Sequence, residues 1–227
     1  MKLVLFDIDG TLILSGRAGL RGMSVAFHKL YGVPNALDHV PFAGRTDRAI
    51  VSDALSGIRR TPTEAEILKL RDAYLEELPG EMPRPAGEPS CVLPGVEALL
   101  EALAGRRDVT VGLLTGNFAG GAAIKLGYFD LWRRFAFGAF GDHHLQRRDL
   151  FPVAMDTARQ YGLPALSPDQ VIIVGDTPLD VDCGRAHGAR VVAVATGHYD
   201  SDALCATGAD LVVDTLSATA ALVEWVG

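Results

Sequence analysis

The chain has 227 residues, of which 48% are hydrophobic and 22% are charged, a balance that suits one globular core or a core with a small second domain. Its net charge is -7 and it contains no long run of Lys or Arg, so it lacks the basic surface that a nucleic-acid partner requires. The same acidity disfavours an anionic membrane surface. It does not exclude an anionic small molecule, because one local cation can dominate a pocket.

Short apolar runs alternate with helical patterns along most of the chain. Runs of this kind predict strands that are buried on both faces, as in a parallel sheet with helices on either side. The expected fold class is therefore α/β, with a doubly wound, mostly parallel, Rossmann-like sheet. The predicted strands are Leu3–Phe6, Val109–Leu114, the weaker Phe135–Phe140, Val171–Val174, Val191–Val194 and Leu211–Val213, and the helices between them include Val96–Leu103, Pro152–Tyr161 and Leu179–His187.

One interval interrupts this alternation. From about residue 14 to about residue 89 there is no strand-like run, and amphipathic patterns predict helices over Gly19–Leu30, Asp47–Leu55 and Thr63–Leu78. The stretch Pro79–Gly87 that follows is rich in Pro and Gly and is typical of a linker. We therefore expect residues 14–89 to form a small α-helical cap domain, inserted into a core made of residues 1–13 and 90–227.

The first predicted strand ends in two carboxylates, within Phe6-Asp7-Ile8-Asp9-Gly10-Thr11. Two such charges ~4 Å apart repel each other by about 4 kcal/mol at an effective dielectric of 20, so a cation is expected nearby. The carboxyl ends of parallel strands line the ligand crevice in folds of this class. Gly10 permits a tight turn there, and the Thr11 hydroxyl can hydrogen-bond a carboxylate or the backbone.

Polar groups also follow two later strands. Thr115-Gly116-Asn117 offers a hydroxyl and an accessible backbone N–H, both of which suit phosphate oxygens. Gly175-Asp176-Thr177-Pro178-Leu179-Asp180 adds a second acidic pair at the start of a helix. Hard oxygen ligands beside a phosphate are typical of a magnesium site.

A phosphate site also needs a cation from the protein. Arg148, at the entry of the helix expected after it, is the preferred candidate, and the adjacent Arg147 is a close alternative. A guanidinium is always charged and matches the geometry of phosphate oxygens.

Taken in order, these segments resemble the four motifs of the haloacid dehalogenase-like hydrolase superfamily. Phe6–Thr11 and Gly175–Asp180 are the specific matches, whereas Thr115–Asn117 is less specific and the basic residue is the weakest, because the family often has Lys-Pro where Arg148-Asp149 stands. The closest similarity is to the phosphoglycolate phosphatase-like branch, in which a helical cap follows the first motif. The resemblance extends over nearly the whole chain.

The resemblance implies a phosphatase that uses Mg²⁺ and acts on a small phosphate ester. Asp7 would attack phosphorus to form an aspartyl phosphate, and Asp9 would protonate the leaving alkoxide and later take a proton from water. Mg²⁺ would be held by Asp7, the backbone carbonyl of Asp9 and Asp176, with Asp180 orienting the site. Phosphoglycolate is the default substrate, because it and the expected cap are both small, and sugar phosphates, nucleotides and pyrophosphate stay open as alternatives.

The remaining residues of the expected site bind the phosphate or the substrate. Thr115 and Arg148 would stabilise the transferring oxygens during catalysis. Arg45 lies in the cap loop Phe42–Asp47, which in the family tends to face the core. The expected binding residues are Gly10, Thr11, Thr115, Gly116, Asn117, Arg148 and Arg45.

Several other functions fit parts of the sequence. A sugar phosphomutase shares both Asp-x-Asp and the cap, and only product analysis separates it from a phosphatase. A carbon–halogen hydrolase has no use for Asp9 as an acid, and a phosphonate hydrolase is expected to lack Asp9 and to use a cap lysine. A non-catalytic binding module on the same fold is expected to lose one of the motif carboxylates, and none is missing here.

The expected location is the cytoplasm. Three widely spaced cysteines fit a reducing compartment and form no zinc motif, and no apolar run is long enough for a signal peptide or a membrane span. The expected partner is a small phosphate ester, with no nucleic acid and no membrane. The oligomeric state is left open.

Overall fold

A six-stranded sheet forms the centre of the computed structural model, which describes residues 1–84 and 87–227. The strands lie in the order β5-β4-β1-β6-β7-β8, and all neighbours are parallel. Their bounds are β1 Lys2–Phe6, β4 Val109–Leu114, β5 Gly138–Ala139, β6 Val171–Gly175, β7 Arg190–Val194 and β8 Leu211–Val213. The predicted α/β class and its parallel sheet are confirmed. The weaker run Phe135–Phe140 contributes only the two residues of β5.

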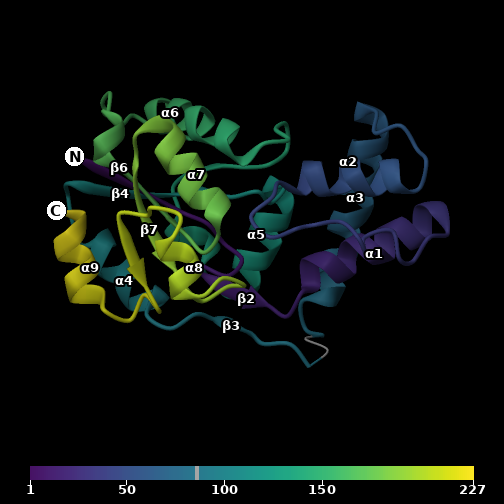
Figure 1. Ribbon diagram of the computed structural model, residues 1–227, viewed down its shortest axis with the longest axis horizontal. Helices are drawn as coiled ribbons and strands as arrows, with labels where there is room; N and C mark the ends of the chain where they lie inside the picture. The colour runs from purple at the N-terminus through teal and green to yellow at the C-terminus, as the bar shows by residue number, and fades with distance from the viewer. Residues whose placement is uncertain (85–86) are drawn as a thin grey trace.

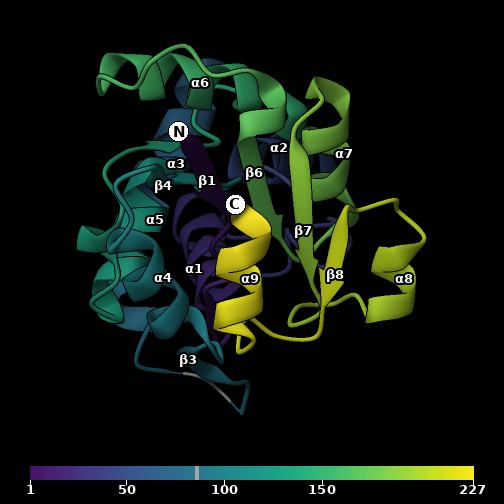
Figure 2. The same cartoon turned by 90° about the vertical axis from the view of Figure 1, so that its left-hand side faces the viewer.

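Helices cover both faces of this sheet (Figures 1 and 2). Because side chains alternate along β1, Val4 and Phe6 pack on one face, while Leu3 and Leu5 pack on the other. The first face is covered by α4 Val96–Ala104, α5 Ala119–Tyr128 and α9 Thr219–Val226, and the second by α6 Leu150–Gln160, α7 Pro178–His187 and α8 Ser201–Cys205. Short 3-10 helices span Trp132–Arg134, Arg147–Asp149 and Pro168–Gln170.

Three helices between β1 and β4 pack around a hydrophobic core of their own. They are α1 Ala18–Tyr31, α2 Asp47–Gly57 and α3 Glu64–Glu81, and their buried side chains include Phe27, Leu70 and Tyr74. Thr46 and Thr63 begin α2 and α3 by accepting a hydrogen bond from a backbone N–H of the first turn. Figure 1 shows these helices at one end of the molecule, with both chain termini at the other.

The chain enters and leaves the helical segment through two paired strands that the sequence did not predict. β2 Ile13–Ser15 and β3 Ser90–Val92 form an antiparallel pair, with Leu14 opposite Cys91. β2 therefore crosses the expected boundary at residue 14, and the division into a core and a cap domain stays a prediction.

The expected linker is partly helical. α3 continues through Pro79 to Glu81, although Pro lacks the N–H for one helical hydrogen bond. Burial of Leu78 and Met82 and two hydrogen bonds from Arg21 to Glu81, of 2.9 and 2.8 Å, offset that loss. Residues 85 and 86 of the expected linker lie outside the described residues. Among the described helices, none has the length and apolar composition needed to cross a bilayer.

Candidate active site

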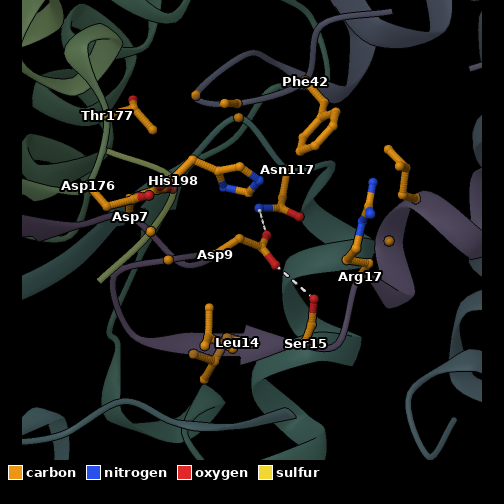
Figure 3. Close-up of a pocket in the computed structure, with 18 of the residues that line it drawn as sticks. Asp7, Asp9, Leu14, Ser15, Arg17, Phe42, Asn117, Asp176, Thr177 and His198 are labelled. Atoms are coloured by element: carbon orange, nitrogen blue, oxygen red, sulfur yellow. Dashed lines mark hydrogen bonds between the residues drawn. The ribbon is translucent and has the colours of Figure 1, made fainter. Parts of the chain in front are cut away.

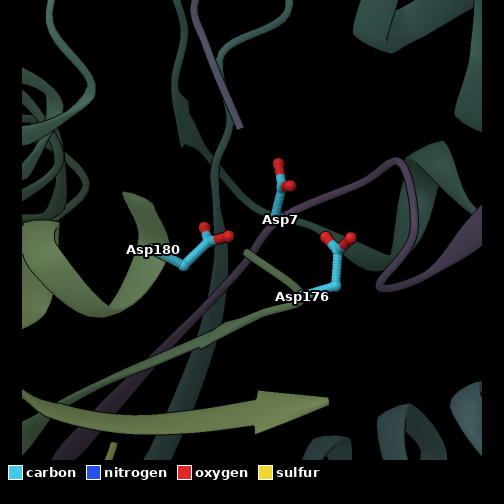
Figure 4. A group of neighbouring side chains, drawn as sticks. All are labelled: Asp7, Asp176 and Asp180. Atoms are coloured by element: carbon cyan, nitrogen blue, oxygen red, sulfur yellow. The ribbon is translucent and has the colours of Figure 1, made fainter. Parts of the chain in front are cut away.

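Three acidic side chains meet where β1 and β6 end. Asp7 follows β1, Asp176 follows β6, and Asp180 lies in the first turn of α7 (Figure 4). One carboxylate oxygen of each lies within 4.8 Å of the others, and all three residues are buried. The register explains the convergence, because Phe6 pairs with Val174 and the next residues of both strands emerge at the same sheet edge.

A buried arginine joins two of these acids. The Arg147 Nη2 atom lies 2.9 Å from Asp7 Oδ1 and 2.6 Å from Asp180 Oδ1. Arg147 also donates to the backbone carbonyls of Leu114 and Gly44, at 3.2 and 3.1 Å. The prediction from the sequence that Arg148 supplies the cation of this site is therefore wrong. The Arg148 side chain is half exposed and pairs with Asp182 at 2.8 Å. Arg147, the alternative, lies in the site.

The acidic cluster retains excess negative charge. Three carboxylates and one guanidinium give -3 + 1 = -2 when all are ionised. Burial, and then the charges of Asp180 and Asp7, raise the pKa of Asp176 well above its ordinary value. Burial likewise raises the pKa of Asp180 to about 6, although Arg147 opposes that shift.

The donor set fits a divalent cation. Asp180 Oδ1 accepts no hydrogen bond from the described residues and has only the ion pair with Arg147. Gly10 and Gly197 flank Asp176 so closely that a Cβ on either glycine would collide with its carboxylate. A net charge of -2 on hard oxygen ligands therefore suits Mg²⁺ better than any soft metal.

Two acids of the cluster, Asp176 and Asp180, also accept hydrogen bonds from threonines. Thr11 is fully buried and donates to Asp176 Oδ1 at 3.2 Å, and Thr177 donates to Asp180 Oδ2 through its hydroxyl at 2.7 Å and its N–H at 3.0 Å. Thr11 and Asp180 therefore act on the site through neighbouring groups, since neither lines the cavity described below.

Asp9 lies apart from the acidic cluster and has its own donors. Ser15 Oγ donates to Asp9 Oδ1 at 3.0 Å, while Asn117 Nδ2 and Lys125 Nζ donate to Asp9 Oδ2 at 3.0 and 2.6 Å. Burial alone would raise the pKa of Asp9, but Lys125, Asn117 and Ser15 together lower it below its ordinary value. In Figure 3 its carboxylate points towards Ser15 and Asn117, away from Asp7 and Asp176.

The segment after β4 lies beside both groups of acids. Thr115 is buried, and its Oγ1 accepts from the Asn117 side chain at 2.8 Å and from the Asn117 N–H at 3.3 Å. The carbonyl of Gly116 accepts from the Asp47 N–H at 2.7 Å, so this loop contacts the helical segment directly. A Cβ at Gly116 would collide with the carbonyl of Arg45, which makes glycine necessary here.

Arg45 lies in the expected loop, but its guanidinium is already engaged. It donates to the Pro41 carbonyl at 3.0 Å and to Asp53 at 2.7 Å. The residue still lines the cavity. Its contact with a substrate remains a prediction, and it requires the guanidinium to exchange or share Asp53.

A cavity of about 360 Å³ connects these groups, between the sheet edge and the helical segment (Figure 3). Most of the expected site residues line it: Asp7, Asp9, Gly10, Arg45, Thr115, Gly116, Asn117 and Asp176. Strand β2, helix α1, the loop before α2 and α2 itself add a largely apolar wall of Leu14, Leu20, Met23, Phe42 and Ile50. The cavity thus has an acidic end and a wall suited to an organic group.

Two polar residues of the site were missed in the sequence. Lys125 is the one charged residue of α5 and is 5% exposed, so a lone lysine in an otherwise apolar helix was the available signal. Asp47 was placed only at the start of a predicted helix, yet its Oδ2 accepts from the N–H of Phe118, which lies between β4 and α5, at 2.8 Å.

Comparisons with known proteins found a matching family model, related sequences and similar structures. A family model described as HAD-hydrolase-like matches residues 147–219. Phosphoglycolate phosphatase of Rhodospirillum rubrum is 30% identical, with 100% of this chain and 91% of the relative covered. Phosphoglycolate phosphatase of Pseudomonas putida is 28% identical, with coverages of 96% and 78%. The structure of CbbY from Rhodobacter sphaeroides in complex with phosphate has a TM-score of 0.70 at 18% identity, with coverages of 96% and 95%.

Proposed function

Because the chain belongs to the haloacid dehalogenase-like hydrolases and its relatives are phosphatases, we propose that it hydrolyses a small phosphomonoester with the help of Mg²⁺. The observation that carries the proposal is the buried cluster of Asp7, Asp176 and Asp180, whose net charge with Arg147 is -2 when all three carboxylates are ionised. The preferred substrate class includes phosphoglycolate, the substrate named for two of the relatives.

The proposed ion is held by Asp7, Asp176 and the backbone carbonyl of Asp9, with Asp180 held in place by Thr177 and Arg147. When bound, it offsets the negative charge of the phosphoryl group and of the carboxylates around it. Arg147 orients the Asp7 carboxylate and supplies a permanent positive charge 2.9 Å from it.

In the proposed reaction a carboxylate oxygen of Asp7 attacks phosphorus. The bond between phosphorus and the ester oxygen breaks, the electron pair leaves with that oxygen, and Asp9 gives it a proton, which yields the alcohol. A water molecule then attacks the aspartyl phosphate and gives its proton to Asp9. The phosphorus–Asp7 bond breaks, which releases inorganic phosphate and restores the Asp7 carboxylate and the protonated Asp9.

The test is a panel of phosphomonoesters that includes phosphoglycolate, glycerol phosphate and hexose phosphates, each assayed for release of inorganic phosphate. We expect release with Mg²⁺ and none with excess chelator. Asp7→Asn is the control and should be inactive while still binding the ester, because an amide is a poor nucleophile. Full activity in chelator contradicts the magnesium assignment. An isomerised sugar phosphate without free phosphate indicates the phosphomutase instead.

A further inference from the structure

Two buried cations at the site contact different acids. Arg147 contacts Asp7 and Asp180, whereas Lys125 contacts Asp9. Arg147 lies in the 3-10 helix before α6, and Lys125 lies on α5, on the opposite face of the sheet. The four carboxylates thus lie in two places. Asp7, Asp176 and Asp180 form the acidic cluster, and Asp9 lies apart from them in the cavity that also has the apolar wall.

We propose that Lys125 is a positioning residue that fixes the Asp9 carboxylate on the leaving-group side of the cavity. The proposal rests on the proposed phosphatase function, because it concerns the acid that protonates the departing ester oxygen. Lys125 itself transfers no proton in it. Its role is to orient Asp9.

The contacts around Lys125 form a closed triangle. Its Nζ lies 2.6 Å from Asp9 Oδ2 and 2.6 Å from Asn117 Oδ1, and Asn117 Nδ2 lies 3.0 Å from the same Asp9 oxygen. Ser15 occupies the other oxygen of Asp9 at 3.0 Å. With donors on both oxygens, rotation of the carboxylate breaks at least one charge-assisted hydrogen bond, and such bonds are stronger than neutral ones.

The surroundings of Lys125 hold its ammonium group in one place. Lys125 extends from α5, which packs on the sheet, and Gly19 of α1 lies against its ammonium group. A Cβ at Gly19 would lie 3.0 Å from Lys125 Nζ. A buried ammonium is costly without a partner, and Asp9 supplies the nearest opposite charge. Lys125 and Asp9 therefore fix each other.

A purely structural role for Lys125 predicts a different outcome from a positioning role. An alkoxide leaves poorly unless the acid protonates it, whereas p-nitrophenolate is a stable anion that leaves without a proton. Loss of the orientation of Asp9 should therefore slow alkyl esters selectively. The ratio kcat/KM isolates this step, because it reports the reaction up to release of the first product and excludes the later attack of water.

The experiment compares Lys125→Met with wild type on the best alkyl ester from the panel and on p-nitrophenyl phosphate, with Mg²⁺ present. We expect kcat/KM for the alkyl ester to fall by about 100-fold or more, the size of a general-acid contribution, and that for p-nitrophenyl phosphate by less than about tenfold. Lys29→Met is the matched control, because Lys29 is an exposed lysine of α1 that pairs with Glu76 and Glu77.

Equal losses with both esters overturn the proposal, since they show a general structural effect. If Lys125→Met does not fold, Asn117→Ala replaces it, because that change removes one donor to Asp9 and one of the two acceptors of Lys125. Asn117→Ala should lower kcat/KM for the alkyl ester more than kcat/KM for p-nitrophenyl phosphate. Equal losses again overturn the proposal. If wild type hydrolyses neither ester, the phosphatase function itself fails, which is a different result.

Discussion

Arg147 and Arg148 are adjacent in sequence but lie in opposite environments. The side chain of Arg147 is 3% exposed and lies between two carboxylates, whereas that of Arg148 is 50% exposed and has one exposed partner, Asp182. Both side chains carry the same charge, so their effects on the protein depend on burial. A buried charge left without its partner is far more costly than a broken surface pair.

We expect Arg147→Met to lower the free energy of unfolding by ~3–5 kcal/mol in metal-free buffer, because Asp7 and Asp180 lose their counterion. Arg148→Met should lower it by no more than ~1 kcal/mol. Urea denaturation of both variants measures the difference. Equal effects of the two substitutions would contradict the assignment of Arg147 to the site.

At this scale the sequence predicted which residue types form the site better than how they are oriented. The carboxylates Asp7 and Asp176 follow from buried apolar strands that end in acids, and the structure brings them together. The choice between Arg147 and Arg148 failed because both lie in a 3-10 helix, where one residue turns the side chain by roughly 120°. Side-chain direction within so short a turn depends on packing that the sequence does not reveal.

Helix α2 is attached to the sheet part of the chain by its first residue. The Asp47 N–H donates to Gly116 O at 2.7 Å, and Asp47 Oδ2 accepts from the Phe118 N–H at 2.8 Å. Burial raises the pKa of Asp47 from 3.8 to about 7, with further increases from Asp9 and Asp142 and opposing effects of Lys125 and the Phe118 N–H. The helix terminus therefore contains a carboxylate that is costly to ionise.

This shift predicts a pH-dependent stability. The folded state holds the Asp47 proton more tightly than the unfolded state. The contribution of Asp47 to the free energy of unfolding is therefore fully present below pH 3.8 and is lost as the pH rises towards about 7. The loss corresponds to roughly 4 kcal/mol. Asp47→Asn keeps an oxygen for the Phe118 N–H and has no such loss. The free energy of unfolding of this variant, relative to that of wild type, should therefore increase as the pH rises from 4 to 8.

Chemical denaturation across that pH range measures the gain. Asp72→Asn on α3 serves as the control, because the side chain of Asp72 is 64% exposed and pairs only with Arg71 among the described residues. A constant difference between Asp47→Asn and wild type from pH 4 to 8 contradicts the prediction.

Elements with an apolar or amphipathic pattern of their own were predictable, and elements held by distant contacts were not. The apolar runs of β1, β4, β6, β7 and β8 and the amphipathic patterns of α1, α2 and α3 gave their positions within a few residues. β2 and β3 were missed because each exists through pairing with a segment about 75 residues away. The end of α3 was missed because the contacts of Arg21 and the burial of Met82 outweigh the effect of Pro79.

On the scale of the whole molecule, we expect the acidic cluster at the sheet edge to couple stability to the proposed binding of Mg²⁺. A ligand that binds only the folded state at 100 times its Kd adds about 2.7 kcal/mol. For a chain of this length, such a gain raises Tm by ~5–10 °C. We expect this increase when Mg²⁺ is added to the metal-free protein.

Asp176→Asn gives the opposite pattern. It removes one of three mutually repelling charges, so its Tm in metal-free buffer should lie above that of wild type, while the increase with Mg²⁺ should disappear. Differential scanning calorimetry with and without Mg²⁺ tests both points. An undiminished increase in the variant would exclude Asp176 as a ligand.

The β2–β3 pair brings the two ends of the helical segment side by side, so that Ser15 lies opposite Ser90. Because the two ends of the inserted segment are neighbours, its length and shape can differ without displacing a strand of the six-stranded sheet. The wall residues Leu20, Met23, Phe42 and Ile50 all lie within this one contiguous stretch, so its replacement would alter that wall and leave Asp7, Asp176 and Arg147 in place.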